Sequence, residues 1–167
     1  DMILKRMKRR HLRDDTIRFC EDVRAARPDV MFGADIIAGF PTETDAMFEN
    51  SMAIVDEAGL THLHVFPYSP REGTPAAKMP PVDGATIKRR AKALREEGRK
   101  RMDAYLASRV GTSAQVLMET GGIGRTEQFT PVAVEGGQGL EAGTLLDLHL
   151  TGHDGTRLAG HPLRAAA

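Results

Sequence analysis

The sequence contains a single cysteine, Cys20, among its 167 residues. One cysteine excludes an internal disulfide and any metal site built only from cysteines of this chain. Long apolar runs are also absent, because no stretch approaches the roughly 18 apolar residues that a membrane span needs. Residues 1–13 are mostly basic and lack the apolar segment of a secretory signal. We therefore expect a cytoplasmic protein with no membrane partner.

The composition predicts a folded chain, since 41% of its residues are hydrophobic and can bury a core in one or two small domains. The sequence begins at Asp1, inside the helix-like stretch 1–7, and has no initiator methionine. This start is expected of a fragment or of a trimmed chain.

The formal net charge is zero, but the charges are unevenly distributed. Residues 1–13 hold six Lys or Arg against one acid, and residues 83–109 hold nine against four acids. From residue 110 onward there are three Arg and six acids. Because phosphate neutralisation needs clustered cations, contact with a polyanion is expected on the first two blocks.

Residues 1–108 show an alternation of helices and apolar strands that predicts a parallel α/β layer. Asp14 and Asp15 are suited to cap a helix over 16–26, with apolar residues at Phe19, Val23 and Ala26. The apolar run 30–39 predicts a strand buried on both faces, and a second strand is expected at 61–66. Between them, a helix capped by Thr44 or Asp45 should bury Phe48, Met52 and Val55 and end at Ala58–Gly59.

A loop rich in proline, 68–82, separates this layer from a long amphipathic helix expected over 83–108. The helix should bury Ile87, Ala91, Leu94 and Tyr105, and Gly98 should weaken its middle. Residues 109–167 are rich in Gly and predict an all-β module, a small closed barrel with strands at 114–118, 129–134 and 145–150. Residues 165–167 should be frayed.

Two polar loops are predicted at the carboxyl ends of the strands, where α/β sheets bind ligands. In GADIIAGFPTET, residues 33–44, Gly39 could let a flat ligand approach the backbone, or it could only make a tight turn while Glu43 caps the next helix. In the second loop, residues 66–76, Phe66 and Tyr68 could flank an adenine and Arg71 could hold a carboxylate or phosphate. Alternatively, this loop is a rigid connection.

Together these two motifs resemble those of the radical S-adenosylmethionine (SAM) methylthiotransferases. The segment HVFPYSPREGTPA at 64–76 and the opening LKRMKRRH at 4–11 are similar to family segments. The resemblance implies an α/β fold, the C-terminal part of a radical SAM partial TIM-type barrel, followed by a small all-β TRAM barrel of OB-like type. It also implies SAM and two 4Fe-4S clusters as cofactors of the whole enzyme.

The form HVFPY at 64–68 and GRTEQFTPV at 124–132 are most similar to the enzymes that add a methylthio group at C2 of N6-threonylcarbamoyladenosine at tRNA position 37. The implied partner is the tRNA anticodon loop. The isopentenyladenosine and ribosomal-protein enzymes are close relatives, so these subfamilies remain alternatives. So do a free-standing tRNA-binding module and the inert remnant of a truncated gene.

The resemblance assigns ligand contacts but no catalytic residue and no metal ligand within this chain. The family's CxxxCxxC loop does not occur in it, so the chain is expected to be inactive by itself, and Cys20 is expected to be a buried apolar residue. The implied SAM-binding residues are Ile37, Gly39, Phe66 and Tyr68. The implied RNA-binding residues are Arg71, Arg89, Arg95, Arg99, Arg125 and Phe129. The cations of 83–109 could also be an ordinary solvated helix face.

Overall fold

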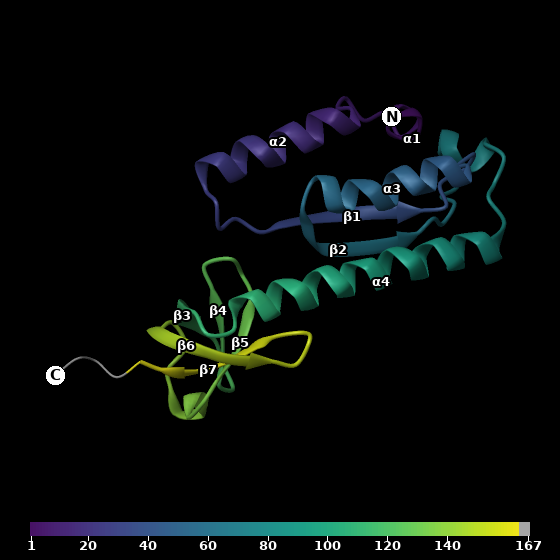
Figure 1. Cartoon of the computed structure of the whole chain (residues 1–167). Coiled ribbons are helices and arrows are strands. Elements are labelled where there is room, and N and C mark those ends of the chain that lie inside the picture. The colour runs from purple at the N-terminus through teal and green to yellow at the C-terminus, as the bar shows by residue number, and fades with distance from the viewer. Residues whose placement is uncertain (164–167) are drawn as a thin grey trace. The chain divides into compact units, whose positions relative to one another are not determined.

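The computed structural model describes residues 1–163 as two compact units, Asp1–Arg101 and a second unit that begins at Met102 (Figure 1). Each unit has its own buried apolar core. The division lies inside a long helix, whose last turns therefore belong to the second unit. The elements up to this helix are α1 (Met2–Arg6), α2 (Arg13–Ala26), β1 (Phe32–Ala38), α3 (Asp45–Glu57), β2 (Leu60–Pro67), the 3-10 helix η1 (Pro75–Lys78) and α4 (Gly84–Arg109).

The first unit is built on β1 and β2, which run side by side in the same direction (Figure 1). Parallel strands need a crossover connection, and α3 supplies it. One face of this sheet packs against α2, α3 and α4 in a single apolar cluster, which confirms the predicted α/β layer. The buried members of the cluster are Cys20, Ala38, Val55, Ala58, Leu60, Ala91 and Leu94.

The other face of this sheet is open in the described structure. Its exposed residues are Gly33, Asp35, His62, His64 and Phe66. Asp35 lies opposite His64 in the register of the two strands, and the rings of His62 and His64 stack with centroids 5.6 Å apart. The prediction that 30–39 is buried on both faces is therefore wrong, because the helices cover only one face.

The helix α2 begins earlier than predicted. Asp14 and Asp15 are not its N-cap, because the helix starts at Arg13 and the Asp15 carboxylate accepts the Leu12 N–H at 2.8 Å. Phe19 lies on the solvent side and is 62% exposed, whereas Cys20 faces the core and is 3% exposed. Burial of Cys20 is thus confirmed, and the apolar repeat at Phe19 does not mark the buried face of α2.

The helix α3 follows its expected start and stop signals, and α4 spans the stretch expected to be helical. The Thr44 hydroxyl accepts the Met47 N–H at the start of α3, and Gly59 takes a left-handed φ of 61° just after its end. The Asp83 carboxylate accepts the Thr86 N–H at 2.9 Å where α4 begins. The helix α4 continues without interruption through Gly98. The missing side chain of Gly98 lets the helix pack closely on Leu63, since a Cβ at Gly98 would lie 3.1 Å from Leu63 Cβ.

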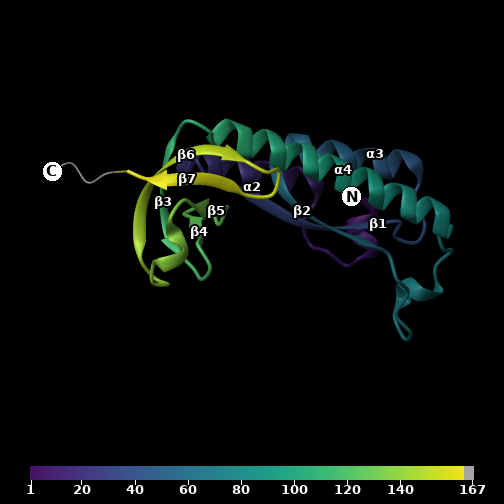
Figure 2. The ribbon, with the colours of Figure 1, turned by 90° about the horizontal axis from the view of Figure 1, so that it is seen from below.

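The second unit is a closed β-barrel with strand order β3-β4-β5-β7-β6, as the sequence predicted for a small all-β module. β3 and β6 close the barrel as an antiparallel pair, and Figure 2 shows β6 and β7 side by side as a hairpin. Leu106 of α4 lies in the barrel core with Val116, Met118 and Leu148. The elements are β3 (Ser113–Met118), β4 (Ile123–Thr126), β5 (Pro131–Val134), the 3-10 helix η2 (Gly137–Gly139), β6 (Leu145–His153) and β7 (Leu158–Pro162).

The sequence did not reveal β4 or β7. β4 is short and contains Gly124, whose missing side chain gives room to Val116, so its apolar alternation is weak. The expected strand 129–134 begins only at Pro131, because Phe129 adopts a left-handed φ of 61° in a turn. The predicted fraying of 165–167 lies outside the described residues.

Candidate functional site at the carboxyl ends of β1 and β2

The carboxyl ends of β1 and β2 bring together the four residues expected to bind a cofactor. Ile37 and Phe66 are register partners on the open side of the sheet, where Phe66 is 51% exposed. The Tyr68 N–H donates to the Ala38 carbonyl at 2.8 Å and so extends the pairing beyond the strands. Gly39 follows Ala38 directly. The order of elements thus brings these four residues to one edge of the sheet. We call this edge, with Ile37, Gly39, Phe66 and Tyr68, the rim.

Gly39 is required here by the fold. Its φ is 76°, a left-handed conformation, and an added Cβ would lie 2.5 Å from Ile87 Cγ1 of α4. Its N–H donates to the Glu43 carboxylate at 2.9 Å. Gly39 therefore makes a tight turn, and its N–H is already engaged within the protein.

Tyr68 carries the polar group at this rim that fits a ligand. Its hydroxyl oxygen is buried and has no hydrogen-bond partner among the described residues. Its ring contacts Phe40 edge-on, with centroids 5.5 Å apart, which fixes the direction of the hydroxyl. A buried hydroxyl without a partner is costly, so a polar group that reaches this hydroxyl would gain a hydrogen bond.

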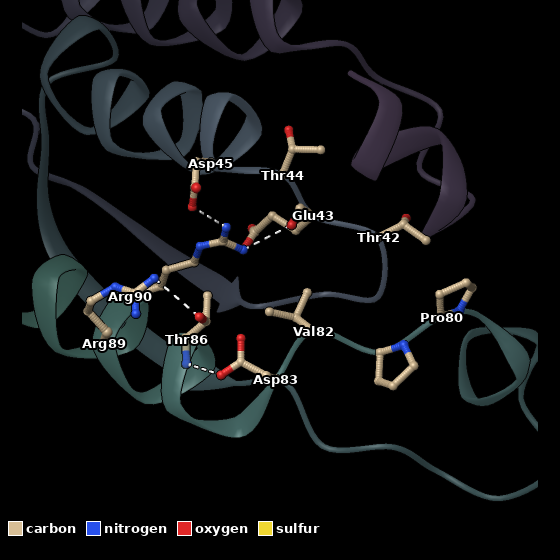
Figure 3. A pocket seen from close by; sticks show the side chains of 11 residues that line it. Thr42, Glu43, Thr44, Asp45, Pro80, Val82, Asp83, Thr86, Arg89 and Arg90 are labelled. Atoms are coloured by element: carbon tan, nitrogen blue, oxygen red, sulfur yellow. Dashed lines mark hydrogen bonds and ion pairs between the residues drawn. The ribbon is translucent and has the colours of Figure 1, made fainter.

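Behind the rim lies a buried ion pair between Glu43 and Arg90, which are 6% and 4% exposed (Figure 3). Arg90 Nη1 donates to the Glu43 carboxylate at 2.8 Å and to its carbonyl oxygen at 3.0 Å, and Nη2 donates to Asp45 at 2.6 Å. Burial raises the pKa of Glu43, whereas the Gly39 N–H and Arg90 favour its charged form. Arg90 therefore ties α4 to the turn that follows β1.

The role of Arg90 was not predicted from the sequence, where Arg90 is one of nine cations in residues 83–109. A usable signal existed, because Arg90 falls on the apolar stripe of Ile87 and Leu94 at helical spacing. A charged residue on a core stripe needs a buried partner. Glu43, expected only as a possible helix cap, is that partner.

A hollow of about 550 Å³ opens beside this ion pair (Figure 3). Thr42 and Pro80 are joined across it by a hydrogen bond of 3.1 Å from N–H to carbonyl oxygen, which pins the proline-rich loop to the rim. The hollow also contains Arg89, but the carboxylates of Glu43, Asp45 and Asp83 outnumber its two arginines. It therefore has no excess of positive charge that would favour an anion.

The expected RNA-binding arginines of the first unit are exposed. Arg89, Arg95 and Arg99 all lie on the solvent side of α4, and Arg71 lies in the loop after β2. Arg99 is 3.9 Å from Glu96, whereas no ion pair in the described part of the chain involves Arg89 or Arg95. α4 therefore presents cations that its own carboxylates neutralise only partly.

In the second unit, the fold brings Arg125 and Phe129 together. Arg125 Nη1 donates to the Phe129 carbonyl at 3.1 Å, and Arg125 Nε lies 2.9 Å from a Glu119 carboxylate oxygen. Phe129 is 76% exposed. These two side chains form a second group of expected RNA contacts.

Comparison with known proteins identifies the relatives of this chain. It is 54% identical over 135 residues to the threonylcarbamoyladenosine tRNA methylthiotransferase MtaB of Rickettsia prowazekii, which covers 81% of this chain and 32% of that protein. The chain is homologous to the tRNA methylthiotransferases. No family model matches it. The chain spans about a third of the length of the methylthiotransferases that it matches.

A second group of methylthiotransferase relatives is named for another substrate. The chain is 35% identical over 166 residues to the tRNA-2-methylthio-N(6)-dimethylallyladenosine synthase of Ruegeria pomeroyi, covering 96% of this chain and 38% of the relative. It is 36% identical over 166 residues to the synthase of that name from Cereibacter sphaeroides. The methylthiotransferase relationship therefore extends over nearly the whole chain, and it includes both substrate classes.

Iron–sulfur clusters are bound by several cysteines, and this chain has one, Cys20. Cys20 is buried in the core of the first unit. Within residues 1–163, no group of three His, Cys, Asp or Glu side chains is arranged to hold a metal ion. In the same range, no helix is long and apolar enough to cross a membrane. The cluster chemistry of the family thus has no ligand set among these residues.

The reactivity of Cys20 offers a direct check of its burial. Burial raises the pKa of the Cys20 thiol, so both access and the thiolate fraction are reduced. We expect an aromatic disulfide reagent to label the native chain at least about tenfold more slowly than the chain in concentrated urea, because labelling must wait for local opening. Equal labelling rates in the two conditions would contradict this placement.

Proposed function

We propose that this chain is the C-terminal part of a tRNA methylthiotransferase of the threonylcarbamoyladenosine type. Residues 1–108 would be the end of a radical SAM domain, and residues 109–167 would form a TRAM domain. The identity of 54% to the Rickettsia prowazekii enzyme carries this proposal, compared with 35% for a dimethylallyladenosine enzyme. The closed five-stranded barrel fits a TRAM domain. We expect the complete enzyme to be cytoplasmic.

The rim of the first unit would contact SAM. Ile37 and Phe66 provide apolar surface suited to an adenine, and Tyr68 provides a buried hydroxyl that lacks a partner in the described structure. In the complete enzyme, SAM and two 4Fe-4S clusters would supply the radical chemistry that places a methylthio group on C2 of the adenosine, with the cluster ligands outside this chain. Gly39 would let SAM approach the backbone because it has no side chain. Its N–H would not bind SAM, since it is hydrogen-bonded to Glu43. This chain by itself would be inactive.

The main contacts with the tRNA backbone would be made by the exposed cations of α4. Arg89, Arg95 and Arg99 can each neutralise a phosphate of the anticodon stem-loop around adenosine 37. Arg71 lies in the loop that follows β2 and can contact a phosphate of the same RNA stem-loop. Arg125 and Phe129 of the second unit would make further contacts with the tRNA.

The test is binding of anticodon stem-loops to this chain across a series of salt concentrations. We expect the loop with threonylcarbamoyladenosine to bind more tightly than the unmodified and isopentenyladenosine loops. Replacing Arg89, Arg95 and Arg99 by Gln should lower the slope of log affinity against log salt by about two to three. The matched control replaces Arg18, Arg27 and Lys78, which are exposed on other elements, and should change the slope less.

Each part of the proposal can fail separately in this experiment. Absence of binding at low salt would contradict the RNA contact. Equal binding of all three loops would contradict recognition of threonylcarbamoyladenosine by this part of the enzyme. An equal change of slope in the control variant would show that the α4 arginines have no special role.

A further inference from the structure

Phe129 is placed in a way that the stability of the barrel does not explain. Its ring is 76% exposed, more than any other large apolar side chain in the described residues. Its φ of 61° lies in the left-handed region, which is unfavourable for an aromatic residue. Both features cost free energy in the isolated fold, so they indicate that the ring serves a binding partner.

The turn that carries Phe129 is rigid. The Thr126 hydroxyl accepts the N–H groups of Gln128 and Thr130, and the Phe129 N–H donates to the Thr126 carbonyl at 2.9 Å. Thr126 and Thr130 are buried, and Thr130 is hydrogen-bonded to the Tyr105 hydroxyl at 3.1 Å. These hydrogen bonds fix the backbone of the turn that presents the ring at the surface. Little conformational entropy of this backbone would therefore be lost on binding.

The strands beside this turn carry a row of two exposed leucines and Arg125. Leu117 lies opposite Arg125 on one side and opposite Leu145 on the other, and both leucines face solvent with exposures of 47% and 59%. Arg125 is held in this row by Glu119 and by the Phe129 carbonyl. We call Phe129, Arg125, Leu117 and Leu145 the Phe129 patch.

We propose that the Phe129 patch stacks an unpaired nucleobase of RNA, an inference that rests on the proposed function above. An aromatic ring and the plane of a guanidinium are both flat partners for a base. Leu117 and Leu145 provide apolar contact beyond them. A base in a duplex has its faces covered by its neighbours, so the patch selects single-stranded segments such as a hairpin loop.

The charge of the second unit favours bases over phosphates as the ligand. Residues 110–167 hold three Arg and six acids, so this part of the chain repels a phosphate backbone overall. Arg125, the cation of the patch, is already paired with Glu119. Stacking needs no net positive charge, so it is the mode of RNA contact that this surface can support.

The experiment uses the full chain and an RNA hairpin with 2-aminopurine in its loop, compared with a blunt duplex of the same stem. We expect Phe129→Leu to weaken hairpin binding by about tenfold and to abolish the quenching of 2-aminopurine, with the salt slope unchanged. Phe129→Tyr should bind as the unmodified chain does, because the aromatic face remains. Leu140→Ala, which removes another exposed apolar side chain, is the control and should change nothing.

A structural explanation of these effects is tested by Phe129→Gly. Glycine adopts the left-handed conformation freely, so this variant should keep or raise the midpoint of thermal unfolding and still lose the hairpin. Wild-type affinity of Phe129→Leu for the hairpin would overturn the stacking proposal, while RNA binding through α4 could stand. Binding of neither hairpin nor duplex by the unmodified chain would overturn the proposed function and this inference together.

Discussion

Replacing Arg90 by methionine will destabilise the first unit by about 3–5 kcal/mol, because Glu43 then remains buried without its partner. The free energy of unfolding can be measured from the urea dependence of far-UV circular dichroism. Arg89→Met is the matched control: this neighbour on α4 is exposed, and its loss should cost within about 0.5 kcal/mol. Equal effects of the two substitutions would show that the buried ion pair contributes nothing particular.

The effect of Arg90→Met should also depend on pH. Burial already raises the pKa of Glu43, and removal of Arg90 takes away a group that opposes the rise. In the variant, the folded state therefore favours protonated Glu43 more than the unfolded state does. The deficit should be largest near neutral pH and should shrink as the pH falls toward about 4.3, the pKa of an unfolded glutamate. A deficit that is constant with pH would contradict this account.

Replacing Gly39 by alanine will be the second large effect. The left-handed φ of 76° costs an alanine roughly 1–2 kcal/mol, and the overlap with Ile87 adds about 1–3 kcal/mol. Gly73 provides a close control, because its φ is 80° and a Cβ there would meet nothing within 4 Å. Gly73→Ala should therefore cost only the conformational part. The same urea unfolding measurement applies to both variants.

A double variant separates the two costs at Gly39. Combining Gly39→Ala with Ile87→Ala removes the overlapping side chain, so the total loss should be smaller than the sum of the two single losses. Additive losses, or equal losses for Gly39→Ala and Gly73→Ala, would mean that the contact with α4 is not what requires glycine at this rim.

The sequence predicted the α/β layer and the barrel because their signals are local. Thr44, Gly59 and the apolar stripe of α4 each define an element from a few neighbouring residues. The rim could also be predicted, because parallel strands joined by a crossover end at the same edge. This geometry predicts that the loops after 30–39 and 61–66 share an edge, whereas the role of Ile37 there is implied only by the family resemblance.

The sequence could not give the features that depend on distant partners. Arg90 and Glu43 are 47 positions apart, so their pairing follows from the packing of α4 on the turn after β1. Exposure of Phe19 depends on which face of α2 packs on the sheet, and that face is the one with Ile17 and Cys20. The left-handed turn at Phe129 arises from hydrogen bonds to Thr126, which no periodicity in the sequence records.

The closing pair of the barrel has a consequence for how the second unit folds during synthesis. β3 is completed by β4 on one side and by β6 on the other, and β6 begins only at Leu145. Until β6 and β7 leave the ribosome, Val116 and Met118 have no complete core in which to be buried. Closure must wait for contacts that are distant in sequence, so we expect the barrel to form late and in one cooperative step.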